Sequence, residues 1–129
     1  MSKKKLSIIS LKKGLLPQFR MFIKNYWNKN HIFSKKNKVL NWFYYSKTKK
    51  KFNFFIAIYK KKIVGAQGYI PFITFDKNLS RRDIFLAFWR VIKTDVIGLG
   101  YLLHKKIIEH TNPDFIGVIG INNELLKFH

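Results

Sequence analysis

Hydrophobic positions along the chain change their spacing several times, and each change predicts a new element. Residues 6–11 alternate loosely between apolar and polar side chains and predict a first strand. From Pro17 onward, apolar residues recur every three or four positions, which predicts a helix because this spacing lines one helical face. Ser34 can cap a second helix, which carries apolar residues between positions 39 and 43. The apolar stripe of the first helix consists of Phe19, Phe22, Ile23, Tyr26 and Trp27.

The middle of the chain predicts a hairpin of two strands. Residues 52–59 are apolar or aromatic except for Asn53, which is typical of a strand buried on both faces. A run of three lysines then makes a turn, and residues 63–70 form the second strand, antiparallel to the first. Gly65 and Gly68 in this strand predict a bulge or the close approach of another segment.

The last part of the chain predicts a strand, a helix and a second, parallel strand. Residues 84–92 form the first strand, and a turn with two glycines leads into a helix that ends at Asn112 and Pro113. Residues 115–121 form the last strand, and a unit of this kind predicts a right-handed parallel crossover. We therefore expect an α/β fold of the α+β type, a mixed and mostly antiparallel sheet flanked by helices. The stripe of the last helix consists of Leu99, Leu102, Leu103 and Ile107.

Composition and charge limit the functions that are open to the chain. Its 129 residues are enough for one domain, and its net charge of +20 fits a nucleic-acid binder among other functions. Residues 1–62 hold 18 Lys and Arg and neither Asp nor Glu. Abundant Lys, Asn, Ile and Phe are also what A/T-rich codons produce, so the charge alone assigns no partner. The absence of cysteine excludes disulfides, thiolate catalysis and cysteine zinc sites.

The sequence predicts a cytoplasmic protein without a metal. Its basic start is followed by apolar residues that Ser7, Ser10 and two lysines interrupt, unlike the core of a signal peptide. The longest apolar run, residues 54–59, is far shorter than the roughly 20 residues that cross a bilayer. His104 and His110 share no metal-ligand spacing with each other or with a carboxylate.

Gly98-Leu99-Gly100 is the place where the sequence points to a specific chemistry. A helix that begins at a glycine turn after a strand presents unpaired backbone N–H groups and the positive end of its dipole to an anion. Glycine also lets an anion approach the backbone closely, because no side chain stands in the way. The turn therefore predicts binding of a phosphate-bearing cofactor such as coenzyme A.

Three segments carry a resemblance to a known family. Residues 55–57, followed by residues 63–68, are similar to the central hairpin of the Gcn5-related N-acetyltransferases, or GNAT family. Residues 89–91, followed by residues 98–103, resemble that family's cofactor motif, a strand and then G-x-G entering a helix with paired leucines. Residues 119–122 resemble its fifth strand and the asparagine that follows. Within the family, the amino-acid sequence is most similar to the sequences of members associated with bacterial surface-polysaccharide biosynthesis.

The resemblance implies an N-acyltransferase that moves an acetyl group from acetyl-CoA to a small-molecule amine, such as an amino sugar of a polysaccharide precursor. Catalysis of this kind rests on aligning the amine with the thioester, on stabilising the oxyanion and on proton transfer. The groups implied along the pantetheine arm and thioester are the backbone of Val91, Ile92 and Lys93 and the side chain of Asn122. The amides implied to hold the pyrophosphate are those of Gly98, Leu99, Gly100 and Tyr101.

Two departures from the family pattern bear on activity. Asp95 stands where the family has Arg or Gln, and its carboxylate would repel phosphates unless it turns outward. The chain also ends inside the helix that follows the family's fifth strand, so we expect residues 1–129 to form one domain without the C-terminal elements of the fold. His129 then aligns with the tyrosine that the family uses as an acid, and His31, in the crossover on the acceptor side, is a second candidate catalytic residue.

Two other functions remain open at this point. A GNAT-like domain without catalysis would serve as a binding module, which Asp95 and the shortened end favour. A basic nucleic-acid-binding protein would explain the charge of residues 1–62, although we expect no specific nucleic-acid partner. The sequence identifies neither the acceptor nor the oligomeric state, and it leaves a homodimer open.

Overall fold

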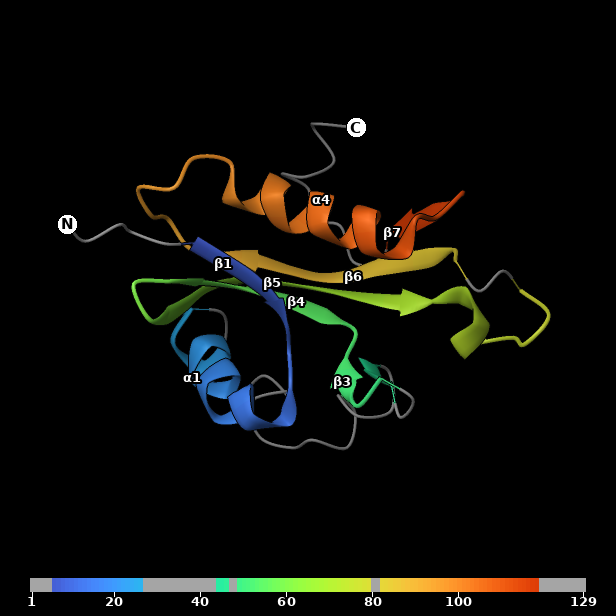
Figure 1. Ribbon diagram of the computed structural model, residues 1–129, viewed down its shortest axis with the longest axis horizontal. Helices are drawn as coiled ribbons and strands as arrows, with labels where there is room; N and C mark the ends of the chain where they lie inside the picture. The colour runs from blue at the N-terminus through green and yellow to red at the C-terminus, as the bar shows by residue number, and fades with distance from the viewer. Residues whose placement is uncertain (1–5, 27–43, 47–48, 80–81, 119–129) are drawn as a thin grey trace.

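The centre of the fold is a five-stranded sheet with the strand order β1-β4-β5-β6-β7 (Figure 1). The structure, a computed structural model, describes residues 6–26, 44–46, 49–79 and 82–118. The strands of the sheet are β1 (Leu6–Ser10), β4 (Phe54–Tyr59), β5 (Lys62–Pro71), β6 (Ile84–Val91) and β7 (Ile116–Val118). The strands of a separate short pair are β2 (Tyr45–Ser46) and β3 (Lys51–Phe52). The helical elements are α1 (Leu16–Tyr26), α4 (Leu99–Thr111) and the 3-10 turns η1 (Lys13–Leu15) and η2 (Phe72–Thr74).

The directions of the strands confirm the predicted sheet. β1 pairs with β4, β4 with β5, and β5 with β6, all in antiparallel register. β6 and β7 are parallel, and α4 connects them, as the strand, helix and strand pattern predicted. The fold is therefore a mixed and mostly antiparallel sheet with helices beside it.

The two long helices cover opposite faces of the sheet (Figure 1). Successive side chains of a strand point to opposite faces, so β4 and β5 need apolar residues at nearly every position to fill both interfaces. Both strands are almost entirely buried, as predicted for β4. The buried residues of the two predicted helix stripes are Phe19, Phe22 and Ile23 in α1 and Leu99, Leu103 and Ile107 in α4.

Gly65 and Gly68 lie at irregular points of the sheet, which confirms the prediction made for them. The β4–β5 register shifts beside Gly65, and the β5–β6 register shifts beside Gly68. A Cβ at Gly65 would lie 3.1 Å from Leu103 of α4, and one at Gly68 would lie 2.7 Å from the Phe54 ring. Glycine at these positions therefore lets α4 and Phe54 pack closely on the sheet.

Two details differ from the sequence prediction. Residues 52–59 are not one strand, because Asn53 separates β3 from β4, and its carbonyl accepts a hydrogen bond from the N–H of Tyr69 at 2.9 Å. Leu102, counted in the α4 stripe, is only half-buried. The helix predicted after Ser34 and the end of the last predicted strand, residues 119–121, lie outside the described residues.

Candidate cofactor and acceptor site

The glycine turn before α4 leaves the first amides of the helix open. Gly98 caps the helix with a φ of +74°, a left-handed conformation that glycine adopts without strain. The N–H of Leu102 donates the first helical hydrogen bond, to the carbonyl of Gly98 at 3.0 Å. In the described part of the chain, the N–H groups of Leu99, Gly100 and Tyr101 donate to no acceptor. These three groups, with the helix dipole behind them, can bind an anion.

Packing fixes the start of α4 above the end of β6. Leu99 and Leu103 are buried against the sheet and hold the helix in place. A Cβ at Gly100 would lie 3.5 Å from Trp89 and 3.7 Å from Val91, so the helix backbone lies directly over these two strand residues. The open amides of the helix are therefore held beside the carboxyl end of β6.

Within the described residues, β6 has unpaired backbone groups at the same end. The N–H of Ile92 donates to the carbonyl of Val64 in β5 at 2.9 Å. Because the polar groups of a strand alternate between its two sides, those of Trp89 and Val91 point away from β5. Within the described ranges, β7 pairs only with residues 84–86 of β6. An extended ligand can therefore pair with the edge of β6 next to the helix start.

The structure brings most of the sequence-predicted cofactor residues to this one end of the sheet. Ile92 differs from its neighbours, because its N–H is already bonded to β5 and cannot donate to a ligand. The predicted positions within the described residues are Val91, Ile92, Lys93, Gly98, Leu99, Gly100 and Tyr101. Asn122, His31 and His129 lie outside the described residues.

The charges near the turn leave room for an anion. Asp95, three residues before Gly98, is exposed to solvent, where water and salt screen its carboxylate from an anion at the turn. Lys93 is also exposed and adds positive charge on the β6 side of the loop. The turn therefore lies between a cation and a screened carboxylate rather than in an acidic environment.

A stacked pair of rings, Trp89 and His104, lies beside the helix start. Their centroids are 5.8 Å apart and their planes are inclined by 22°. Burial lowers the pKa of His104 below its usual value, because the charged ring would lose part of its hydration. His104 is therefore neutral at pH 7, and its Nδ1 is buried without a partner in the described part of the chain. No sequence pattern marks this pair, because it joins β6 to α4 across the loop between them.

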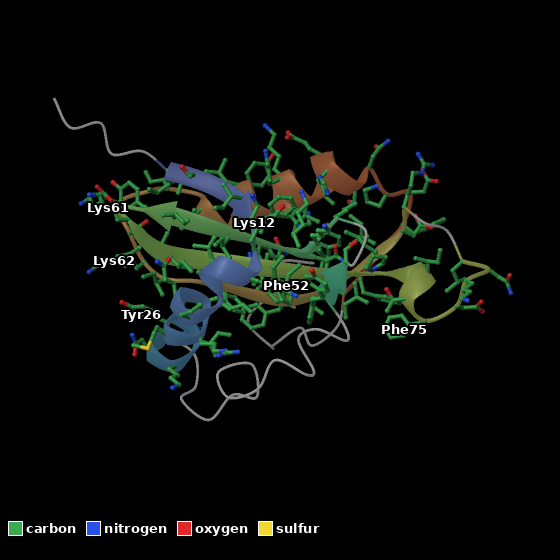
Figure 2. All side chains as sticks on the ribbon, turned by 60° about the horizontal axis from the view of Figure 1, so that its bottom comes forward. Lys12, Tyr26, Phe52, Lys61, Lys62 and Phe75 are labelled. Atoms are coloured by element: carbon green, nitrogen blue, oxygen red, sulfur yellow. The ribbon has the colours of Figure 1, made fainter. Side chains whose placement is uncertain are left out.

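A cavity of about 470 Å³ lies on the opposite face of the sheet, at the same end. It is enclosed by α1, the β4–β5 turn, the start of β5 and Ile92. Figure 2 shows Lys61, Lys62 and Tyr26 on this side of the molecule. The floor is apolar and includes Phe22 and Ile63, whereas the polar residues of the rim are Gln18, Asn25, Lys61 and Lys62. No sequence motif marked this cavity, because it forms only when α1 packs on the hairpin.

Among the described residues, no three His, Cys, Asp or Glu side chains form a group that could hold a metal ion. The helices within those same ranges include none that is long and apolar enough to cross a membrane.

Comparison with known proteins gives matches in structure only. No protein-family model and no curated protein matches the sequence. The aminoglycoside N-acetyltransferase AAC(6')-Iy, solved with CoA, is 12% identical with a TM-score of 0.69, over 98% of this chain and 84% of that one. Naa50 of Arabidopsis thaliana, solved with a CoA-based bisubstrate analogue, is 15% identical with a TM-score of 0.64, over 95% and 78%. The aminoglycoside acetyltransferase meta-AAC0020 from an uncultured soil sample, solved with sisomicin, is 20% identical with a TM-score of 0.60, over 95% and 84%.

At these identities the likeness is one of fold. It agrees with the features already described: the antiparallel hairpin, the parallel β6–β7 pair and the glycine turn that starts α4. The chain has the fold of the GNAT acetyltransferases.

Proposed function

We propose that the chain is an N-acetyltransferase that moves the acetyl group of acetyl-CoA to a small amine. One observation carries the proposal: within the described residues, three amides at the start of α4 donate no hydrogen bond, and they lie beside an edge of β6 that pairs with no strand there. Amides at a helix start suit a diphosphate, and a strand edge suits an arm with peptide-like groups. Coenzyme A contains both groups in sequence. Two of the solved structures with this fold contain CoA or a CoA-based analogue, which supports the proposal.

Each part of the donor then has a proposed partner. The N–H groups of Leu99, Gly100 and Tyr101 would hold the diphosphate, and Lys93 would lie near its charge. The outward backbone groups of Val91 would pair with the pantetheine arm and the thioester carbonyl, and the side chain of Asn122 is a further proposed contact. The N–H of Ile92 has no part in this scheme, because β5 already uses it.

The reaction forms a C–N bond and breaks a C–S bond. The neutral amine attacks the thioester carbon, CoA leaves as a thiolate that takes up a proton, and the nitrogen loses its proton as the amide forms. Alignment of the two reactants supplies much of the rate, and an N–H directed at the carbonyl oxygen stabilises the oxyanion. We propose His129 as the acid that protonates the thiolate and keep His31 as the second candidate catalytic residue.

We further propose that the acceptor is an amino sugar and that residues 1–129 act as one domain in the cytoplasm. Support for the sugar comes from the two aminoglycoside acetyltransferases with this fold, since aminoglycosides are built from amino sugars. A non-catalytic binding module is the second candidate, which Asp95 in place of the family's Arg or Gln favours.

Calorimetric titration of the folded chain with acetyl-CoA tests the proposal. We expect saturable binding, followed by release of the free CoA thiol when an acceptable amine is added. Folded protein that binds no acetyl-CoA at about 1 mM, an affinity worth only about 4 kcal/mol, would refute the enzyme and the binding module together. Binding without transfer to any of a panel of amines would favour the binding module.

A substitution at Tyr101 tests the amides themselves. Tyr101→Pro removes one N–H that donates to no acceptor in the described part of the chain, and proline is tolerated in the first turn of a helix. Tyr101→Ala keeps the N–H and is the reference, because both variants lose the exposed phenol ring. We expect acetyl-CoA to bind about tenfold or more weakly to the proline variant than to the alanine variant, since one charge-assisted hydrogen bond is lost. Equal affinity of the two variants, with equal helix content by circular dichroism, would remove this amide from the site.

A further inference from the structure

The described charged side chains that line the cavity between α1 and the β4–β5 turn are all basic. Its volume of about 470 Å³ is in the range of small-molecule sites. The described part of its lining contains no Asp or Glu, and two of the four polar rim residues named above are Lys61 and Lys62. Neither lysine forms an ion pair with another described residue. Among the described residues, the rim therefore offers two ammonium groups without an ionic partner above an apolar floor.

The two-residue turn between β4 and β5 has a strained backbone. Lys60 and Lys61 have φ values of 52° and 66°, and the flanking Tyr59 and Lys62 pair across the hairpin. A two-residue turn with two left-handed positions favours Asn and Gly, because a longer side chain is strained there. Strained backbone that persists is a reason to look for a role of the residue that holds it. Only Lys61 of the two lines the cavity, whereas the ammonium group of Lys60 lies over the Tyr59 ring.

A third cation stands close to the same cavity. Nε of Arg90, on β6, donates a hydrogen bond to the carbonyl of Tyr26 at 2.8 Å, and Tyr26 lines the cavity. This bond joins the end of α1 to β6 and keeps the guanidinium near the rim. An acceptor with several positive charges, such as the sisomicin bound in one similar structure, would meet repulsion here. A negatively charged acceptor would be attracted.

The position of the cavity links it to the proposed donor site. Ile92 lines the cavity, and it directly follows Val91, whose outward backbone groups form the open edge of β6. The cavity and the glycine turn thus lie at one end of the sheet, on opposite faces. An amine held in the cavity is therefore at the same end of β6 as the thioester.

We infer that this cavity binds the acceptor, and that the acceptor is an amine that also carries a phosphate or carboxylate group, held by Lys61 and Lys62. The inference rests on the proposed acetyltransferase function and narrows its substrate class to anionic amines. It departs from the polycationic aminoglycosides after which AAC(6')-Iy and meta-AAC0020 are named, because the described rim has cations where a polycation would need acids.

Three amino sugars that differ in one charged group test the inference. The acetyl-CoA-loaded chain is titrated with glucosamine, with glucosamine 6-phosphate and with 2-amino-2-deoxyglucuronic acid, in which a carboxylate replaces the C6 hydroxymethyl group of the same ring. We expect at least one anionic sugar to bind about tenfold or more tightly than glucosamine, and sisomicin to bind more weakly than that sugar. The preferred anionic sugar identifies phosphate or carboxylate as the recognised group. Binding of both anionic sugars no tighter than glucosamine, or preference for sisomicin, would overturn the inference.

Two neighbouring lysines give a matched pair of variants. Lys60→Asn and Lys61→Asn each remove one charge and each place asparagine at a left-handed position that suits it. We expect Lys61→Asn to weaken binding of the preferred anionic sugar about fivefold and to leave acetyl-CoA binding within about twofold. Lys60→Asn, outside the cavity, should change neither by more than about twofold. Equal effects of the two variants would reduce the site to general charge attraction and overturn the inference.

The controls separate this inference from the proposed function. If the wild-type chain binds no acetyl-CoA, the proposed acetyltransferase function is rejected, whatever the cavity binds. Normal acetyl-CoA binding with no preference for anionic amines would reject the cavity inference and leave the acetyltransferase standing. Urea unfolding of both asparagine variants shows whether the hairpin is intact, and we expect both to be at least as stable as the wild type.

Discussion

Asp83 holds together two segments that lie far apart in the sequence. Its Oδ1 accepts hydrogen bonds from the N–H groups of Asp114 at 3.0 Å and Phe115 at 2.9 Å, and only 7% of the residue is exposed. Its own carbonyl accepts the N–H of Phe72 at 2.9 Å. These bonds place the start of β7 beside the start of β6, where the parallel pairing begins. No sequence pattern predicts this role of Asp83, because the partners of its carboxylate are more than 30 positions away.

We predict that Asp83→Ala lowers the free energy of unfolding by about 2 kcal/mol, since two N–H groups lose a charged acceptor. Asp83→Asn keeps an acceptor oxygen and should lose about half as much. Urea denaturation followed by tryptophan fluorescence measures both changes. Asp114→Asn is the control, because it removes only the exposed ion pair with Arg82 and should cost about 1 kcal/mol or less. A cost of Asp83→Ala no larger than that of the control would contradict the assigned role.

At the scale of elements, local signals in the sequence predicted α4 at both ends. Gly98 and Asn112 take left-handed conformations, and the N–H of Asn112 closes the helix on the carbonyl of Ile108 at 2.8 Å. Glycine and asparagine tolerate that conformation, and proline after Asn112 cannot continue the helix. These residue types alone therefore predict where the helix begins and ends. The glycine turn at the start of α4 also leaves the amides of the candidate site open, so these amides could be predicted from the sequence.

Contacts between elements could not be predicted in this way. Hydrophobic periodicity reports which face of an element is buried, but not which residue of a distant segment meets it. The Trp89–His104 stack, the cavity beside Lys61 and the break at Asn53 all depend on such meetings. The hairpin glycines are an intermediate case, because Gly65 and Gly68 signalled a close approach without naming the partner.

The Trp89–His104 stack leads to a prediction of how the stability of the fold depends on pH. Burial lowers the pKa of His104 in the folded chain, so the unfolded chain takes up a proton first as the pH falls through about 6.5. The stability that His104 contributes is therefore complete above that pH and declines below it. His104→Phe keeps a ring on Trp89 but cannot titrate, so its stability should fall less than that of the wild type between pH 7.5 and pH 5.5.

Urea denaturation at the two pH values measures this difference. His110, whose pKa is also lowered, first by burial and then by nearby lysines, titrates in both proteins and cancels in the comparison. Equal losses of stability in the two proteins would show that His104 is not held neutral by the fold.

At the scale of the whole molecule, general charge and the candidate site respond differently to salt. The net charge of +20 attracts any polyanion, and residues 1–62 supply most of it. Such attraction comes from counterion release and grows with the number of phosphates contacted. The amides at the start of α4 carry no net charge, and in the proposed site they would hold an anion through short hydrogen bonds that salt screens less. The steepness of the salt dependence therefore distinguishes a polyanion on the surface from a cofactor in a site.

We predict that duplex DNA loses about a thousandfold in affinity between about 50 and 200 mM salt and shows no sequence preference, as expected for many phosphate contacts. In the proposed site, acetyl-CoA would contact few cations, so its affinity should fall about tenfold or less over the same range. Fluorescence anisotropy measures the first and calorimetry the second, with Tyr101→Pro as the variant that should weaken acetyl-CoA without changing DNA. If the affinities for DNA and acetyl-CoA fall equally steeply with salt, acetyl-CoA binds only as one more polyanion on a basic surface. A strong sequence preference in DNA binding would instead favour nucleic-acid binding as the function.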